Sequence, residues 1–68
     1  MLAAERQSKI IEITERKGSV QVEELASELK VSAMTIRRDL VKLQEEGKLE
    51  RCHGGAVAKQ EENYAQKQ

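Results

Sequence analysis

The chain has 68 residues and a single cysteine, which limits it to one small domain without an internal disulfide and favours a reducing, cytoplasmic setting. No apolar run approaches the length of a membrane span, and a single aromatic residue argues against stacking on single-stranded nucleic acid or sugar. Twelve basic and twelve acidic residues cancel, but residues 30–59 carry seven of the basic and four of the acidic groups, a modest excess that a solvated surface also explains.

The first predicted element is a helix over residues 3–17. Isoleucines at its centre give it one apolar face, and a basic last turn followed by Gly18 is a typical C-terminal stop. Residues 19–22 then alternate polar and apolar side chains, which is the pattern of a very short strand.

A second helix is predicted over residues 22–30, because its apolar side chains recur at the spacing of one helical face. Lys30 follows at a turn where the backbone often takes a positive φ, a conformation that suits glycine better than lysine. Ser32 is a good N-cap, so a third helix is expected to begin at once and to run to about Glu46, with Gly47 ending it. Two helices joined by so short a turn form an αα unit.

Two short runs, residues 48–52 and 56–58, flank a pair of glycines and are predicted to form a β-hairpin. The order helix, short strand, helix, helix, hairpin predicts a mainly α (α+β) winged helix-turn-helix domain over residues 1–58, with three helices and a small β-hairpin wing. Residues 59–68 are polar, carry no core pattern and are interpreted as a linker or tail.

The third helix carries the strongest functional pattern. If Ile36 marks the buried face, the helical period predicts that Met34 and Arg38 face solvent and that Arg37 lies on one flank. Arginine can donate two hydrogen bonds to a guanine edge, so this face suits a recognition helix in duplex DNA. A solvated amphipathic helix fits the same pattern equally well. Asp39 is expected either to orient a neighbouring basic or hydroxyl side chain or to be a simple surface acid.

The only cysteine lies beside the only histidine, at Cys52 and His53. Neighbours on a strand point to opposite faces, and zinc needs three or four ligands, so this pair predicts no metal site. No catalytic residue, metal or cofactor is assigned. Cys52 is interpreted as a half-buried strand residue, and His53 as a contact from the wing in preference to a plain surface residue.

Three segments together resemble a known family. The runs TIRRDL, residues 35–40, and RCHGGA, residues 51–56, resemble the N-terminal DNA-binding domain of the DeoR family of bacterial transcription regulators. The segment VEELASEL, residues 22–29, is similar to the first helix of that family's motif, so the resemblance covers roughly residues 2–58. Lys30 stands where the family commonly has glycine, and Cys52 is not part of its pattern.

The resemblance implies a protein of the bacterial cytoplasm that binds a double-stranded DNA operator, with the third helix in the major groove and the wing on the backbone or minor groove. Family members are mostly repressors of sugar or nucleoside metabolism. They typically carry a C-terminal domain that binds a sugar phosphate and mediates oligomerisation. The chain is therefore expected to be an N-terminal fragment of a longer regulator that forms a homo-oligomer through that domain. The alternative is a winged helix that binds another protein.

The residues expected to contact DNA lie at the start and on the exposed face of the third helix and in the wing. They are Ser32, Ala33, Met34, Thr35, Arg37, Arg38, Lys42, Arg51, His53, Gly54 and Gly55.

Overall fold

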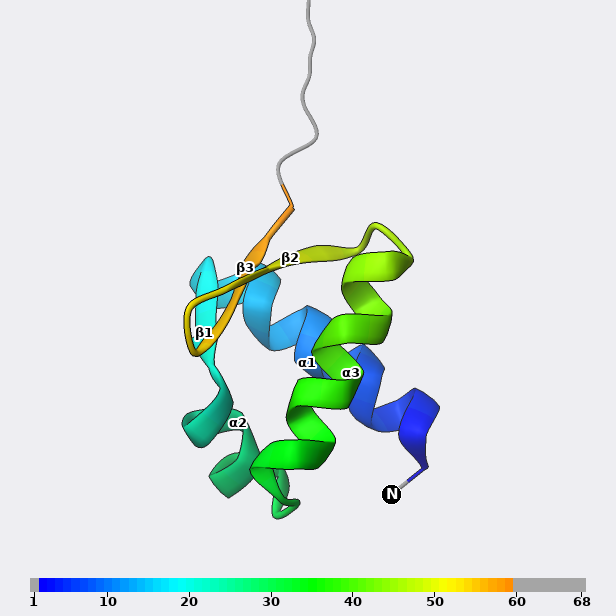
Figure 1. The fold of residues 1–68 in the computed structure, drawn as a ribbon, viewed down its shortest axis with the longest axis vertical. Helices are drawn as coiled ribbons and strands as arrows, with labels where there is room; N and C mark the ends of the chain where they lie inside the picture. The colour runs from blue at the N-terminus through cyan, green and yellow to red at the C-terminus, as the bar shows by residue number, and fades with distance from the viewer. Residues whose placement is uncertain (1, 60–68) are drawn as a thin grey trace, which may run out of the picture.

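The computed structural model describes residues 2–59 of the chain. Their secondary structure is α1 (Ala3–Lys17), β1 (Ser19–Gln21), α2 (Val22–Leu29), α3 (Ala33–Glu45), β2 (Leu49–Cys52) and β3 (Gly55–Ala58). This order confirms the winged helix-turn-helix fold, and the helix bounds agree with the predicted ones to within one residue (Figure 1). Of the predicted linker, only Lys59 lies within the described residues, and it is exposed after β3.

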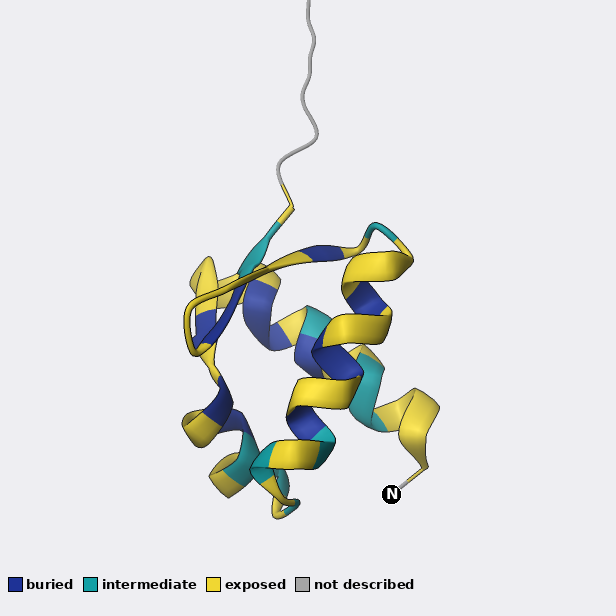
Figure 2. Cartoon of the chain, viewed as in Figure 1, coloured by how far each residue is buried: buried dark blue, intermediate teal, exposed yellow. Residues whose placement is uncertain are grey.

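The core lies where the three helices meet the small sheet, and buried residues line the inward side of each element (Figure 2). All of its members are aliphatic, and their removal from water is the main driving force for folding. They are Ile10, Ile13, Val20, Val22, Leu25, Ile36, Leu40, Leu43, Leu49 and Ala56. Three of them come from α3 at the helical spacing, so the opposite side of α3 is left facing solvent.

The sheet has three antiparallel strands in the order β1-β3-β2. The hairpin of β2 and β3 was predicted, but the addition of β1 to the far side of β3 was not. Val20 on β1 pairs with Ala56 on β3, and both side chains are buried in the core. The wing is therefore joined through β3 to β1, the strand between α1 and α2 in the chain.

The two glycines of the hairpin serve different purposes. Gly54 is the second residue of the turn and has φ +72°, a conformation that L side chains rarely adopt. Gly55 is buried in β3, and a Cβ built on it would lie 1.9 Å from the backbone oxygen of Val20. The tight reversal expected of the pair thus depends on Gly54, whereas Gly55 permits the close approach of β1.

The turn of the wing also supports the start of α2. Gln21 is the N-cap residue of α2 and its side chain makes no capping hydrogen bond. Instead, the backbone amide of Val22 donates to the carbonyl of Gly54 at 2.8 Å. An amide that a helix start leaves without an intrahelical partner is satisfied in this way by the wing.

Candidate nucleic-acid interface

The turn between α2 and α3 is tight, and both of its sequence-predicted features are present. Lys30 has φ +61° and ψ +45°, the left-handed conformation expected there, and Val31 donates its amide to the carbonyl of Ala26 at 3.0 Å. Ser32 caps α3: its hydroxyl accepts a hydrogen bond from the amide of Thr35 at 3.1 Å. This geometry leaves the N-terminal end of α3 at the surface, where Ser32 is exposed.

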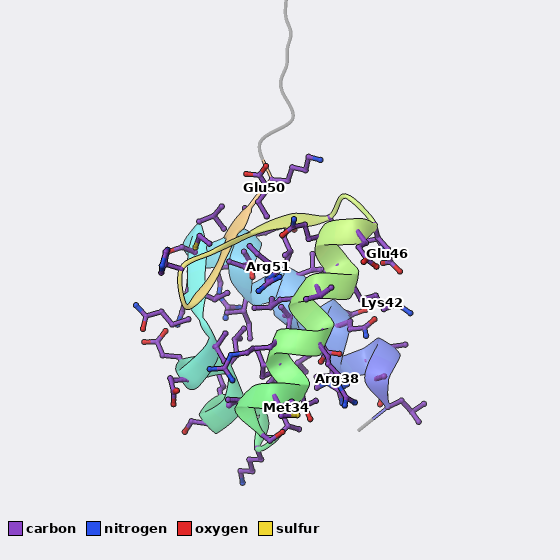
Figure 3. All side chains as sticks on the ribbon, viewed as in Figure 1. Met34, Arg38, Lys42, Glu46, Glu50 and Arg51 are labelled. Atoms are coloured by element: carbon purple, nitrogen blue, oxygen red, sulfur yellow. The ribbon has the colours of Figure 1, made fainter. Side chains whose placement is uncertain are left out.

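The outward side of α3 carries a row of exposed side chains that begins with Met34, which is 64% exposed, and continues through Arg38 to Lys42 (Figure 3). Arg37 is exposed as well, whereas Ala33 and Thr35 are half-buried. Residues four positions apart are neighbours on a helix surface, so Arg38 and Lys42 form a basic strip, and Arg37 adds a third positive charge on its flank. The strip ends at Glu46, beyond the C-terminus of α3.

The basic side chains of this strip form no ion pair within 4.0 Å with an acid of the described residues. Among residues 2–59, the ion pairs within 4.0 Å are Arg6 with Asp39 and Lys48 with Glu46. Arg37, Arg38 and Lys42 take part in neither of them. Their positive charge is therefore available to an anionic partner, at little cost in broken internal contacts.

The wing places a second exposed basic group near α3. The amide of Arg51 donates to the side-chain oxygen of Gln44 at 2.9 Å, which ties β2 to the C-terminal half of α3. Arg51 lies between the hairpin and α3 in Figure 3, whereas Glu50 of the same strand points away from the helix. Gln44 and Arg51 line a shallow depression with the exposed tip of the wing, Cys52 to Gly54.

Gln44 was missed by the sequence-based prediction. Its position seven residues after Arg37 puts both on the same flank of α3, which was the available signal. That signal identifies the flank of α3, but the contact with Arg51 depends on how the wing packs against α3. Gly55, in contrast, was predicted to contact DNA but is buried against β1, and of the glycine pair only Gly54 is exposed.

Asp39 corrects a prediction. It is only 4% exposed and accepts hydrogen bonds from both Nε and Nη2 of Arg6, the latter at 3.0 Å, and from Nε2 of Gln7 at 3.1 Å. The alternative of a plain surface acid was therefore wrong. Asp39 does pair with a basic side chain, as the other alternative expected, but that partner is Arg6 of α1 and not a neighbour on α3. Position 39 is three residues after Ile36 and four before Leu43, within the buried arc of α3. A buried carboxylate requires hydrogen-bonding or charged partners, and α1 supplies them here.

Burial and ion pairing shift the pKa of Asp39 in opposite directions. Burial disfavours its charged form, but the hydrogen bonds from Arg6 and Gln7, with the charges of Arg6 and Lys42, outweigh burial and hold the pKa of Asp39 below its usual value. The hydrogen bond to Asp39 raises the pKa of Arg6, against the opposing effect of burial. Both groups are therefore charged at neutral pH, and α1 is joined to α3 by an ion pair.

Cys52 also differs from the expectation, because it is exposed and not half-buried. Strand β2 lies at an edge of the sheet and only its first residue, Leu49, reaches the core. His53 is exposed in the turn. Within the described residues no group of three or more His, Cys, Asp or Glu side chains is placed to hold a metal ion. None of the described helices is long and apolar enough to cross a membrane.

Comparison with known proteins agrees with this geometry. Residues 6–62 match the family model of the DeoR-like helix-turn-helix domain. The chain is 54% identical over 61 residues to an uncharacterized HTH-type transcriptional regulator, YulB, of Bacillus subtilis, which covers 90% of this chain and 24% of that protein. It is 45% identical over 65 residues to the HTH-type transcriptional regulator GolR of Listeria innocua, covering 94% of this chain and 26% of GolR.

A third relative is a lactose phosphotransferase system repressor of Staphylococcus epidermidis, 44% identical over 52 residues, which cover 76% of this chain and 21% of the repressor. The chain thus spans about a quarter of the length of the curated relatives that it matches. No solved structure matches the chain significantly.

Proposed function

Because this chain belongs to the DeoR family of DNA-binding helix-turn-helix transcription regulators, which are not enzymes, we propose that it recognises particular sequences of double-stranded DNA through α3 and the wing. In this proposal α3 lies in the major groove, which is wide enough to admit a helix, and the wing rests on the backbone or in the adjacent minor groove. The observation that carries the proposal is the set of exposed arginines and lysine on α3 and β2 that form no ion pair within 4.0 Å among the described residues.

The individual roles follow from the chemistry of the side chains. Arg37 and Arg38 suit base edges, because a guanidinium can donate two hydrogen bonds to one guanine. Lys42 lies farther along α3 and suits a phosphate as a point charge. The exposed N-terminal end of α3, capped by Ser32, offers backbone amides to a second phosphate. On the wing, Arg51 and His53 are the candidates for backbone or minor-groove contact.

The wider role is proposed from the curated relatives, of whose length this chain spans about a quarter. We propose that a regulator carrying this domain represses an operon of sugar metabolism, which is supported by the lactose phosphotransferase system repressors among its relatives. Sugar-phosphate binding and assembly into a homo-oligomer would then belong to a further region such as the one by which the relatives exceed the match. A dimer would join two half-sites and raise the affinity through effective concentration.

A role in binding another protein is less well supported. A protein-binding surface needs apolar or aromatic anchors gathered in one patch. Among the described residues the large exposed hydrophobic side chains are Leu2, Met34 and Val41. Only the last two of these lie on α3, where they are interspersed with Arg37 and Arg38, so this face suits an anionic partner better.

The proposal can be tested by selecting preferred duplexes from a random pool with this domain and then measuring affinities for a selected and a random duplex. Arg37→Ala or Arg38→Ala should each cost about 1–3 kcal/mol on the selected duplex and relax the preference at one position if that arginine contacts a base. A uniform loss across all sequences would assign that arginine to phosphate instead.

Arg16→Ala is a matched control, because it removes the same charge from an exposed residue of α1. It should change both affinities far less than the α3 substitutions. Selection that yields no preferred duplex, or equal losses from all three variants, would contradict the proposed role of α3.

A further inference from the structure

Three side chains form a buried polar contact between α1 and α3, which we call the Arg6–Asp39 clamp: Arg6 and Gln7 of α1, and Asp39 of α3. Arg6 approaches both carboxylate oxygens of Asp39, with Nε on one and Nη2 on the other, and Gln7 adds a hydrogen bond of 3.1 Å to Oδ1. The side chain of Asp39 is 5% exposed and that of Arg6 is 15% exposed. The contact joins residues 33 positions apart in the sequence.

The clamp constrains α3 in a way that the apolar core does not. Ile36, Leu40 and Leu43 hold α3 in place by hydrophobic packing, which is largely non-directional. A guanidinium that meets a carboxylate with two parallel hydrogen bonds fixes both distance and orientation. The clamp therefore adds a directional constraint on the rotation of α3 about its own axis to the constraint from packing.

Its place along α3 is at the middle of the exposed basic strip. Asp39 follows Arg38 directly in the chain and is one helical turn from Lys42. A rotation of α3 about its axis would move the tips of long side chains such as Arg38 sideways, away from the base edges that the proposed function assigns to them. Hydrogen bonds lose most of their strength when their geometry is poor, so a small rotation has a large effect on base recognition.

We propose that the Arg6–Asp39 clamp is a positioning device that sets the orientation of α3 for base recognition, so that three residues with no contact to DNA determine its sequence preference. This inference rests on the proposed function. It extends that function from the residues that face DNA to the interior of the domain. A buried ion pair adds little stability compared with well-packed apolar residues. Stabilisation of the fold is therefore a weaker explanation of the clamp than orientation of α3.

The test is the double variant Arg6→Met/Asp39→Leu, which removes one positive and one negative charge and leaves the net charge unchanged. Replacement of a buried ion pair by apolar side chains of similar size is often neutral for stability, so the variant should fold. We expect its affinity for a random duplex to stay near that of the wild type, and its selectivity for a selected duplex to fall about tenfold or more. A folded double variant with the selectivity of the wild type would overturn the clamp proposal.

A milder variant guards against loss of the fold. Gln7→Met keeps the Arg6–Asp39 ion pair and removes one hydrogen bond, and it should lower selectivity about threefold without a change in random-duplex affinity. Arg6→Lys keeps the charge but loses the two-pronged geometry, so its selectivity should also fall. Wild-type selectivity in both variants would contradict a geometric role. A wild-type domain that selects no duplex would overturn the proposed function itself, whereas a selective wild type with equally selective variants overturns only the clamp.

Discussion

The side-chain oxygen of Gln44 accepts a hydrogen bond from the backbone amide of Arg51 at 2.9 Å, which fastens the edge strand β2 to α3. On its other side the wing is held by the bond between the carbonyl of Gly54 and the amide of Val22. The wing is thus attached to both helices of the helix-turn-helix unit. We infer that Arg51 is held at a fixed position relative to the basic strip of α3 before DNA binds.

Gln44→Ala should loosen this attachment. The free energy of unfolding should fall by about 1 kcal/mol, the usual contribution of one such hydrogen bond, and the amide of Arg51 should exchange its hydrogen faster. Hydrogen exchange followed by NMR measures this directly. Glu45→Ala is the matched control, since it truncates the neighbouring exposed residue and leaves the contact intact. Unchanged exchange at Arg51 in Gln44→Ala would mean that the wing is held without this contact.

The paired glycines should respond very differently to alanine. At Gly55 a Cβ would meet the carbonyl of Val20, so β1 and β3 must separate, and Gly55→Ala should cost about 3 kcal/mol. At Gly54 nothing lies within 4 Å of a built Cβ, and only the positive φ opposes alanine, at a cost of about 1 kcal/mol. Urea denaturation of both variants gives the comparison. Equal losses would contradict the separate roles of the two glycines.

Lys30 is the only non-glycine residue with positive φ among the described residues, so Lys30→Gly should stabilise the domain. The expected gain is about 0.5–1 kcal/mol, because glycine takes the left-handed conformation without strain but loses more entropy on folding. Lys30→Ala removes the same charge and keeps the strain. Its stability should stay at or below that of the wild type, and a similar gain in both variants would point to the charge instead of the backbone.

The stability of the domain should depend on pH through Asp39. Its pKa is lower in the folded state, so its contribution is complete above the unfolded pKa of about 4 and is lost as pH falls towards the folded value. At pH 6–7, Asp39→Asn should lower the free energy of unfolding by about 3 kcal/mol, because it leaves Arg6 partly buried without its counter-charge. Chemical denaturation should show this difference shrinking below pH 4. A difference that is constant from pH 7 to pH 3 would contradict the ion pair.

Much of the fold could be predicted because its signals are local. The apolar spacing of α2 and α3, the capping Ser32 and the hairpin glycines each identify an element from a few neighbouring residues. The place of β1 in the sheet could not be predicted, because a pairing such as Val20 with Ala56 joins segments far apart in the chain. A strand of three residues carries too little pattern to specify its partner.

The candidate site divides in the same way. The helical period correctly predicted that Met34, Arg37 and Arg38 face solvent. It did not reveal the partner of Asp39, because Arg6 lies on another helix and nothing in the sequence around either residue indicates the other. Burial of Asp39 could have been inferred from its spacing to Ile36 and Leu43, but the choice of partner required the packing of α1 on α3.

The most direct measurement is an NMR titration of this domain with a selected duplex and a random duplex at two salt concentrations. We expect the largest chemical-shift changes at residues 33–38 and 51–54. Binding should be weaker at the higher salt, because lysine and arginine side chains release counterions from the phosphates and added salt opposes that release. The random duplex should perturb the same surface with smaller changes at Arg37 and Arg38. Shifts centred on the groove between α1 and α2, around Lys9 and Glu28, or binding indifferent to salt, would contradict the account.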